Sequence, residues 1–242
     1  MERVSTGIEG LDEMLGGGLL PNRVILVRGG PGAGKTIFSL QFVLEGIKKG
    51  ERGVYITLEE PLNLIKANMA MFGWDLEEFE DKDKLRIIDG SQLVYKPFGS
   101  ARYGESSGLI ITGMANQIKL AVESFKAKRL AVDPITSAVI HQRFPTDKRL
   151  EIMELVKTLR ELRCTSIITS EFSSPSAEGE FYVEEYLADG VIVLAKTQHD
   201  FKVIRTVRID KMRGIKHDDQ PRKYEIMNKG FLVYNTEQVT SQ

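Results

Sequence analysis

Apolar and polar positions along the chain fall into blocks that predict a regular alternation of strands and helices. Short, mostly apolar runs typical of buried strands lie at residues 22–29, 53–59, 85–90, 129–139 and 165–171. Longer segments with a helical spacing of apolar residues lie at 34–50, 60–73, 109–128 and 148–163. Strands that alternate with helices in this way are typical of an α/β fold, in which helices flank a mostly parallel central sheet.

The C-terminal part of the chain follows a different pattern. The segments 189–197, 201–214 and 223–235 alternate apolar and polar residues and are joined by short turns. Such segments pair as antiparallel strands, so we expect them at the C-terminal edge of the sheet. Because no linker rich in proline, serine or glycine divides the sequence and no internal repeat is visible, residues 1–242 are predicted to form a single domain.

Composition narrows the class of protein. The 242 residues carry a formal net charge of −1, so no overall field attracts the chain to nucleic acid or to anionic lipid. The single cysteine, Cys164, excludes an internal disulfide framework, and we expect a small core residue rather than a reactive thiol. The N-terminus lacks the continuous apolar core of a signal peptide, and no run approaches the ~18 apolar residues of a membrane helix. A cytoplasmic protein without membrane association is therefore expected.

The stretch GGPGAGKT, residues 29–36, follows a predicted strand and opens a predicted helix. It matches G-x-x-x-x-G-K-T, the phosphate-binding loop of nucleotide-binding proteins. Glycines allow positive φ angles and let backbone N–H groups approach phosphate oxygens, while the helix adds its positive N-terminal end. The residues predicted to bind nucleotide are Gly30, Pro31, Gly32, Ala33, Gly34, Lys35 and Thr36.

Three side chains are expected to handle the phosphates and a metal ion. Lys35 would reach the β- and γ-phosphates, and the Thr36 hydroxyl would ligate Mg²⁺. Asp133 ends the apolar run RLAVD, and a charge that follows buried strand residues needs a partner. In phosphate-loop NTPases that partner is Mg²⁺, often through water; the alternative is an acid held by backbone N–H groups. ATP and Mg²⁺ are thus the predicted cofactors.

Two adjacent acids, Glu59 and Glu60, follow the apolar run VYITL. A glutamate at the end of a strand beside the phosphate loop can orient and deprotonate an attacking water. Acids before Pro61 equally suit the start of a helix, where the helix dipole favours negative charge. The spacing leaves both interpretations open. Glu59, read as the last strand residue, is the better candidate for catalysis.

A pair of cations in the segment DKMRG also invites two interpretations. Lys211 and Arg213 are two residues apart, hence on one side of a strand, and Gly214 lets the chain turn. They could form a solvated surface at the edge of the sheet. They could also reach the γ-phosphate of a neighbouring chain and neutralise the charge that develops there.

Taken together, these segments resemble the KaiC-like ATPases of the RecA superfamily over most of the chain. The resemblance rests on STGIEGLDEMLGGGLLP before the phosphate loop, then LEE, FGWD, LAVDPITSAV, VEEYLADGVIVL and KMRGIKHD, in that order. It implies a RecA-like core assembled as a homo-hexameric ring with ATP between subunits. It also implies that Glu59 is the catalytic glutamate and that Asp133 is the Walker B aspartate.

The resemblance assigns further residues around the nucleotide. Lys211, Met212, Arg213 and His217 match the segment that touches the neighbouring subunit's nucleotide. The turn at 225–230 and the residues before FGWD fall where relatives line the base and ribose.

Several positions depart from the family pattern. Pro134 stands where many relatives carry serine, and Ile215 replaces a common hydroxyl residue, which removes one polar contact with the nucleotide. The circadian-clock protein has two such domains in tandem, whereas this chain has one. Glu185 and Tyr186 stand in place of its phosphorylated serine and threonine, so we expect no clock role through self-phosphorylation.

Three functions compete at this stage. The first is an ATPase that hydrolyses ATP slowly and regulates a protein partner. The second is a DNA-handling ATPase, because the loop 91–108 mixes aromatic and basic residues, although the loop 172–188 is acidic and disfavours a bound strand. The third is a scaffold for which ATP binding rather than turnover matters. The complete set of Lys35, Thr36, Glu59 and Asp133 favours the first.

Overall fold

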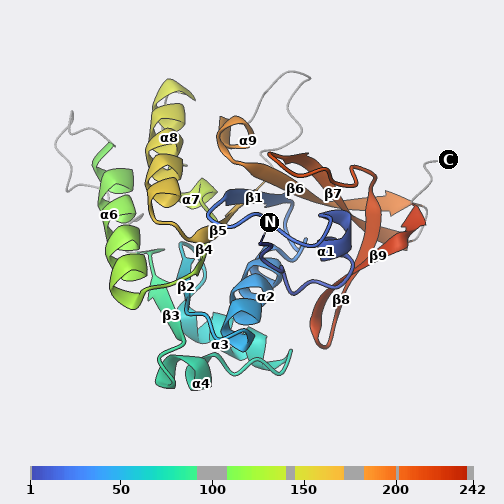
Figure 1. Cartoon of the computed structure of the whole chain (residues 1–242), viewed down its shortest axis with the longest axis horizontal. Helices are drawn as coiled ribbons and strands as arrows, with labels where there is room; N and C mark the ends of the chain where they lie inside the picture. The colour runs from blue at the N-terminus through green and yellow to red at the C-terminus, as the bar shows by residue number, and fades with distance from the viewer. Residues whose placement is uncertain (1, 92–107, 140–144, 172–182, 200–201, 239–242) are drawn as a thin grey trace.

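One mixed sheet organises the part of the chain that the computed structural model describes, residues 2–91, 108–139, 145–171, 183–199 and 202–238 (Figure 1). Its strand order is β3-β2-β4-β5-β1-β6-β7-β8-β9. The strands are β1 Val24–Gly29, β2 Gly53–Thr57, β3 Leu85–Asp89, β4 Arg129–Asp133, β5 Thr165–Ser170, β6 Gly190–His199, β7 Lys202–Met212, β8 Arg222–Met227 and β9 Gly230–Gln238. The pairs from β3 through β6 are parallel, and those from β6 to β9 are antiparallel. This architecture confirms the predicted RecA-like α/β class.

Helices cover both faces of the sheet. They are α1 Leu11–Met14, α2 Lys35–Lys48, α3 Leu62–Ala70, α4 Leu76–Asp81, α6 Gly108–Phe125, α7 Thr136–Val139, α8 Pro145–Glu161 and α9 Val183–Leu187. Buried residues of α1, α2 and α3 join one core cluster, and those of α6, α7 and α8 join another. In Figure 1, α6 and α8 lie together on the left, apart from α2, α3 and α4. Within the described residues no helix is long and apolar enough to cross a membrane.

The central strands β1, β2, β4 and β5 are buried along their whole length because both faces are covered. In β1, Ile25 and Val27 belong to the cluster under α2, whereas Val24 and Leu26 belong to the cluster under α6 and α8. Successive side chains of a strand point to opposite faces, so each strand contributes to both cores. The strands are thereby fixed from two sides, and the loops at their carboxyl ends start from rigid positions.

The predicted strand at 129–139 is wrong beyond Asp133. β4 ends there, and α7 begins at Thr136. Pro134 explains the difference, because proline has no N–H to donate to a neighbouring strand and its φ angle is fixed. The apolar residues that follow are buried as a short helix instead, with Ile135 N–H bonded to Thr169 O at 2.9 Å. Periodicity alone does not separate these two outcomes.

Other predictions need smaller corrections. β6 pairs with β7 in the predicted antiparallel way, but it also pairs in parallel with β1. The last predicted segment, 223–235, contains parts of two strands, β8 and β9, which form a hairpin. Glu59 is not in β2, which ends at Thr57. The short helices α1, α4 and α9 carry too few turns to show a helical period. Cys164 is buried as expected, and burial raises the pKa of its thiol to about 12.

A buried guanidinium ties the amino end of β4 to three other segments. Arg129 is 1% exposed, and its Nη1 donates to Ser5 O at 2.6 Å and to Phe42 O at 2.9 Å. Its Nε donates to Glu51 Oε2 at 2.6 Å. Because a buried charge without partners is costly, these contacts fix the segment before the phosphate loop onto α2 and β4.

A second buried charge fixes the start of β1. The Asp189 carboxylate accepts a hydrogen bond from Val24 N–H at 3.1 Å and pairs with Arg160 of α8 at 2.9 Å. Burial works to raise the pKa of Asp189, but the hydrogen bonds from Arg160 and Val24 outweigh it and hold the pKa below its ordinary value. The carboxylate therefore stabilises the fold in its charged form.

Replacement of Arg129 by methionine keeps much of the side-chain volume but removes the donor that the carbonyls of Ser5 and Phe42 share, together with the ion pair to Glu51. We expect a loss of about 2–4 kcal/mol in the free energy of unfolding, measured by urea denaturation. Asp83→Asn is the control, because Asp83 is 65% exposed and its ion pair with Arg52 lies at the surface, so its loss should stay below about 1 kcal/mol. Equal stabilities of Arg129→Met and the parent would contradict the assignment.

The Asp189 contacts predict a pH-dependent stability. Because the folded-state pKa is lowered, the stabilisation is present above the ordinary value of 3.8 and is lost as pH falls through the folded-state pKa. Asp189→Asn should therefore cost about 1–2 kcal/mol at neutral pH, and the difference from the parent should shrink in acid. Thermal unfolding at a series of pH values measures this. Asp210→Asn removes a carboxylate that pairs with Arg208 of the same strand and should show a much smaller difference at every pH.

Candidate nucleotide site

Residues 30–34 connect β1 to α2 and form the loop that the sequence predicts. Gly32 and Gly34 have φ angles of +68° and +89°, at which any side chain would be strained. A side chain at Gly34 would also clash, because an ideal Cβ would lie 2.6 Å from Ile226 Cδ1. No side chain caps α2, which begins at Lys35, so its first N–H groups are left for an anion.

The C-terminal hairpin supports this loop. The Tyr224 hydroxyl of β8 donates to Ala33 O at 2.8 Å, and its ring stacks on Phe231 of β9 with centroids 4.2 Å apart. Phe231 in turn lies edge-on to Phe38 of α2 at 5.5 Å. The antiparallel edge of the sheet thus packs on the phosphate loop and holds its shape.

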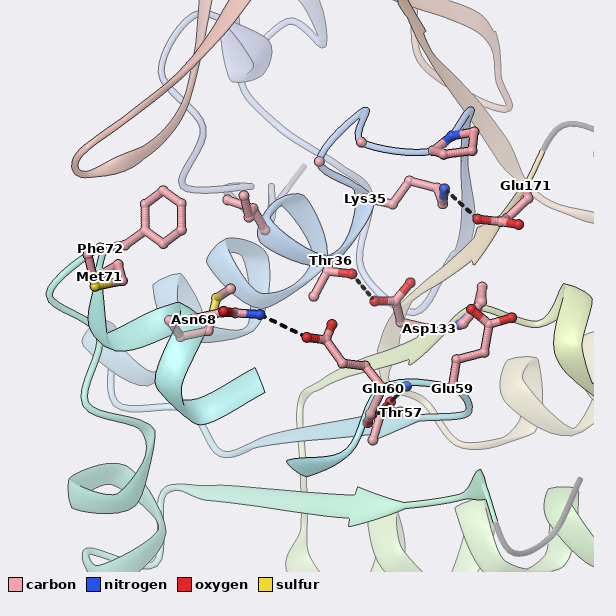
Figure 2. Close-up of a pocket in the computed structure, with 16 residues that line it drawn as sticks. Lys35, Thr36, Thr57, Glu59, Glu60, Asn68, Met71, Phe72, Asp133 and Glu171 are labelled. Carbon is pink, nitrogen blue, oxygen red and sulfur yellow. Dashed lines mark hydrogen bonds and ion pairs between the residues drawn. The ribbon is translucent and has the colours of Figure 1, made fainter. Parts of the chain in front are cut away.

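Lys35 is nearly buried and lies along the loop. Its Nζ donates to Gly29 O at 2.9 Å and to Gly30 O at 3.3 Å. The same ammonium pairs with Glu171 Oε1 at 3.3 Å, and Glu171 directly follows β5 (Figure 2). The cation predicted to bind phosphate is therefore held by a carboxylate that an incoming phosphate would replace.

Asp133 lies at the centre of a network of hydroxyl groups. Its Oδ2 accepts hydrogen bonds from Thr36 Oγ1 at 2.6 Å and from the Tyr55 hydroxyl at 2.7 Å, and its Oδ1 accepts one from Thr169 Oγ1. Burial raises the pKa of Tyr55 well above its ordinary value and the Asp133 carboxylate raises it further, so the phenol stays protonated and donates. The network fixes Asp133 next to Thr36.

Thr36 and Asp133 fit a magnesium site. They present a hydroxyl and a carboxylate oxygen 2.6 Å apart, and Mg²⁺ prefers oxygen ligands and retains waters. Within the described residues no group of three or more acidic, histidine or cysteine side chains could hold a metal by itself. Mg²⁺ in nucleotide sites is usually bound through one or two carboxylates and the phosphates of the substrate rather than in an all-protein cage.

Glu59 and Glu60 both line the cavity but are held by different elements. A Glu59 carboxylate oxygen accepts a hydrogen bond from Ser137 Oγ of α7. Glu60 Oε1 accepts one from Asn68 Nδ2 of α3 at 2.8 Å, and its backbone closes a turn on Thr57. In Figure 2 the Glu60 side chain points to Asn68, and Glu59 lies on the other side of the turn.

These residues surround a cavity of about 580 Å³ beside the phosphate loop (Figure 2). One wall is the loop and the start of α2, and a second is formed by Glu59, Glu60, Asp133 and Glu171. The third wall is apolar and consists of Met69, Met71 and Phe72. Met71 is 82% exposed, which is unusual for a methionine and leaves an apolar surface open beside polar groups. The cavity therefore offers cationic, metal-binding and apolar surfaces to one ligand.

The C-terminal residues predicted to touch nucleotide do not line this cavity. Lys211 Nζ donates to three carbonyls at the end of α9, at 2.7 to 3.1 Å, and Arg213 donates to one of them and pairs with Asp189. Burial, and then the nearby Arg213, lower the pKa of Lys211. Met212 is buried against Gly190, and His217 Nδ1 lies 3.2 Å from Ile215 O. Their contact with a neighbouring chain stays a prediction.

The structure adds residues that the sequence did not single out, namely Tyr55, Ser137, Thr169, Glu171 and Tyr224. Glu171 had a signal, because it directly follows an apolar strand and ligands bind at the carboxyl ends of parallel strands. The hydroxyl residues had none, since they lie within strands or a short helix. The basic and aromatic residues between 92 and 107 that favour DNA binding lie outside the described residues.

Comparisons with known proteins identify the family of this chain. The family model for the KaiC ATPase matches residues 4–238. A UPF0273 protein of Thermotoga maritima is 35% identical over 98% of both chains. The circadian clock protein KaiC3 of Synechocystis is 36% identical over 96% of this chain and 45% of its own length.

A solved structure supports the same conclusion. A KaiC-like protein of the hyperthermophilic archaeon Pyrococcus horikoshii matches with a TM-score of 0.81 at 33% identity, over 96% of this chain and 99% of that one. The matched length and identity show that this chain belongs to the KaiC ATPase family.

Proposed function

We propose that this protein binds ATP with Mg²⁺ in the cavity beside the phosphate loop and hydrolyses it to ADP and phosphate. The observation that carries the proposal is the hydrogen bond of 2.6 Å between Thr36 and Asp133, within one cavity that Lys35 and Glu59 also line. Membership of an ATPase family supports it. Phosphate binding, metal binding and a general base would then be united around one ligand.

Each residue has a distinct part in this reaction. The N–H groups of the loop and Lys35 would balance the charge of the phosphates, and Thr36 and Asp133 would hold Mg²⁺. A bound Mg²⁺ neutralises charge that develops on the phosphate oxygens. Glu59 would take a proton from the water whose oxygen attacks the γ-phosphorus while the bond to the ADP oxygen breaks. Glu59 would then return this proton to solvent, which balances the reaction.

The base of the nucleotide would lie on the apolar wall of the cavity. Met69 and Met71, which precede FGWD, and Phe72, its first residue, form this wall. Such side chains bind a planar ring without reading its polar edge in detail. They support the assignment of the segment before FGWD to the base and ribose. Residues 225–230 line a separate pocket with Gln41 and Trp74, so their contact with the nucleotide stays a prediction.

For the assembly we propose a homo-hexameric ring with ATP between subunits. In that ring four residues would approach the nucleotide of the neighbouring subunit rather than the cavity of their own chain, which they do not line: Lys211, Met212, Arg213 and His217. The ATPase cycle would regulate a protein partner in the cytoplasm. No described residue favours the DNA-handling alternative, and Glu185 of the acidic loop is paired with Arg28 inside the chain.

Phosphate release with Mg-ATP tests the proposed reaction. Glu59→Gln should bind ATP like the parent but release phosphate about 100-fold or more slowly, because it cannot accept the proton. Lys35→Ala should lose most ATP binding. The native mass of the same preparation with ATP should correspond to six chains. Parent-like hydrolysis by Glu59→Gln, or parent-like binding by Lys35→Ala, would refute the proposal.

The ion pair between Lys35 and Glu171 predicts a gain in affinity. Glu171→Gln frees the ammonium from a competing carboxylate, so the dissociation constant for ATP should fall about 2- to 5-fold, as expected for a partly exposed pair. Titration calorimetry at low salt measures this change. Glu60→Gln is a matched control. It removes an equal charge from the cavity wall, but the Glu60 carboxylate accepts a hydrogen bond from Asn68 and is not paired with Lys35. An equal gain in both variants would assign the effect to overall charge.

A further inference from the structure

The carboxylate of Glu59 accepts a hydrogen bond from Ser137, a residue in a rigid part of the protein. Glu59 is exposed and lies in the turn after β2, where long side chains adopt several rotamers. Ser137 is 5% exposed, and its Oγ donates to Glu59 Oε1. A buried hydroxyl thus contacts an acid that would otherwise be free to move.

The backbone around Ser137 is well fixed. Ile135 N–H donates to Thr169 O at 2.9 Å, and Ala138 N–H donates to Ile135 O at 3.1 Å. Ile135, Ala138 and Val139 are all buried in the core under α6 and α8. The hydroxyl therefore has a defined position relative to Asp133, which precedes it by four residues and ends β4.

The adjacent Glu60 shows that this contact is selective. Its carboxylate is held by Asn68 of α3, on the opposite side of the turn. Ser137 and Asp133 belong to one short segment, so Glu59 is the acid that is tied to the metal-binding side of the cavity.

We propose that Ser137 is a positioning residue for the general base, an inference that rests on the proposed ATPase function. The hydroxyl has a single proton, and by donating it to Oε1 it fixes the carboxylate and leaves Oε2 as the acceptor for the attacking water. Ser137 exchanges no proton with Glu59 and does not touch the nucleotide. Ser137 acts on the orientation of the Glu59 carboxylate. The rate of hydrolysis depends on this orientation, because the carboxylate and the attacking water must be aligned.

Steady-state hydrolysis by Ser137→Ala tests this role. The kcat should fall about 5- to 20-fold while the KM for ATP stays within about twofold, because binding groups are untouched and orientation is lost. Ser137→Thr retains the hydroxyl and should recover most of kcat. Ser166→Ala is the matched control. It removes another buried hydroxyl, that of a residue in β5 which donates to Cys164 O, and it should leave kcat and KM unchanged.

A double-variant cycle separates positioning from a general structural effect. In the Glu59→Gln background the substitution Ser137→Ala should cause no further loss in single-turnover rate, since the base is already absent. A parent-like or faster kcat for Ser137→Ala, or an equal loss in both backgrounds, would overturn the inference while Glu59→Gln remains slow. Parent-like hydrolysis by Glu59→Gln would instead refute the proposed function, and this inference with it.

Discussion

The hydrogen bond between Thr36 and Asp133 is the contact on which the site depends. It joins the first turn of α2, the helix that follows β1, to the end of β4. In the sheet β5 lies between β1 and β4, and Thr169 of β5 bonds to the same carboxylate. Asp133 is 6% exposed, so its charge requires such partners. Any displacement of one of these three strand ends would separate the two groups that fit Mg²⁺. The register of the parallel strands is therefore a functional constraint.

That register follows from the two cores. Alternate residues of each central strand are buried in different cores, and a shift by one residue would exchange side chains of different size and shape between two closely packed interiors. Because the strands are parallel, their carboxyl ends meet at one edge, where Thr57, Asp133, Ser170 and Gly29 lead into the turns of the site. Chemical groups far apart in the sequence thus gather without a long loop to place them.

The sequence predicted what depends on consecutive residues and missed what depends on contacts between strands. The phosphate loop, with Lys35 and Thr36, is one contiguous motif, and the order of strands and helices follows from periodicity. Tyr55, Ser137 and Thr169 have no such signal, because their role arises only when β2, β4 and β5 lie side by side. The strand predicted through Pro134 failed for a related reason: apolar residues after it are buried in either conformation, and only the missing N–H distinguishes them.

The environment of Lys211 and Arg213 bears on how subunits in the proposed ring would influence one another. Lys211 already donates to three carbonyls, those of Glu185, Tyr186 and Ala188, and these bonds are charge-assisted because the donor is an ammonium. A phosphate of a neighbouring subunit would have to replace them, and the exchange would gain only from the negative charge of the new acceptor. Two of the carbonyls belong to α9, whose Glu185 pairs with Arg28 near the end of β1, next to the phosphate loop. In the proposed ring, occupation of one site would thereby alter the support of the next.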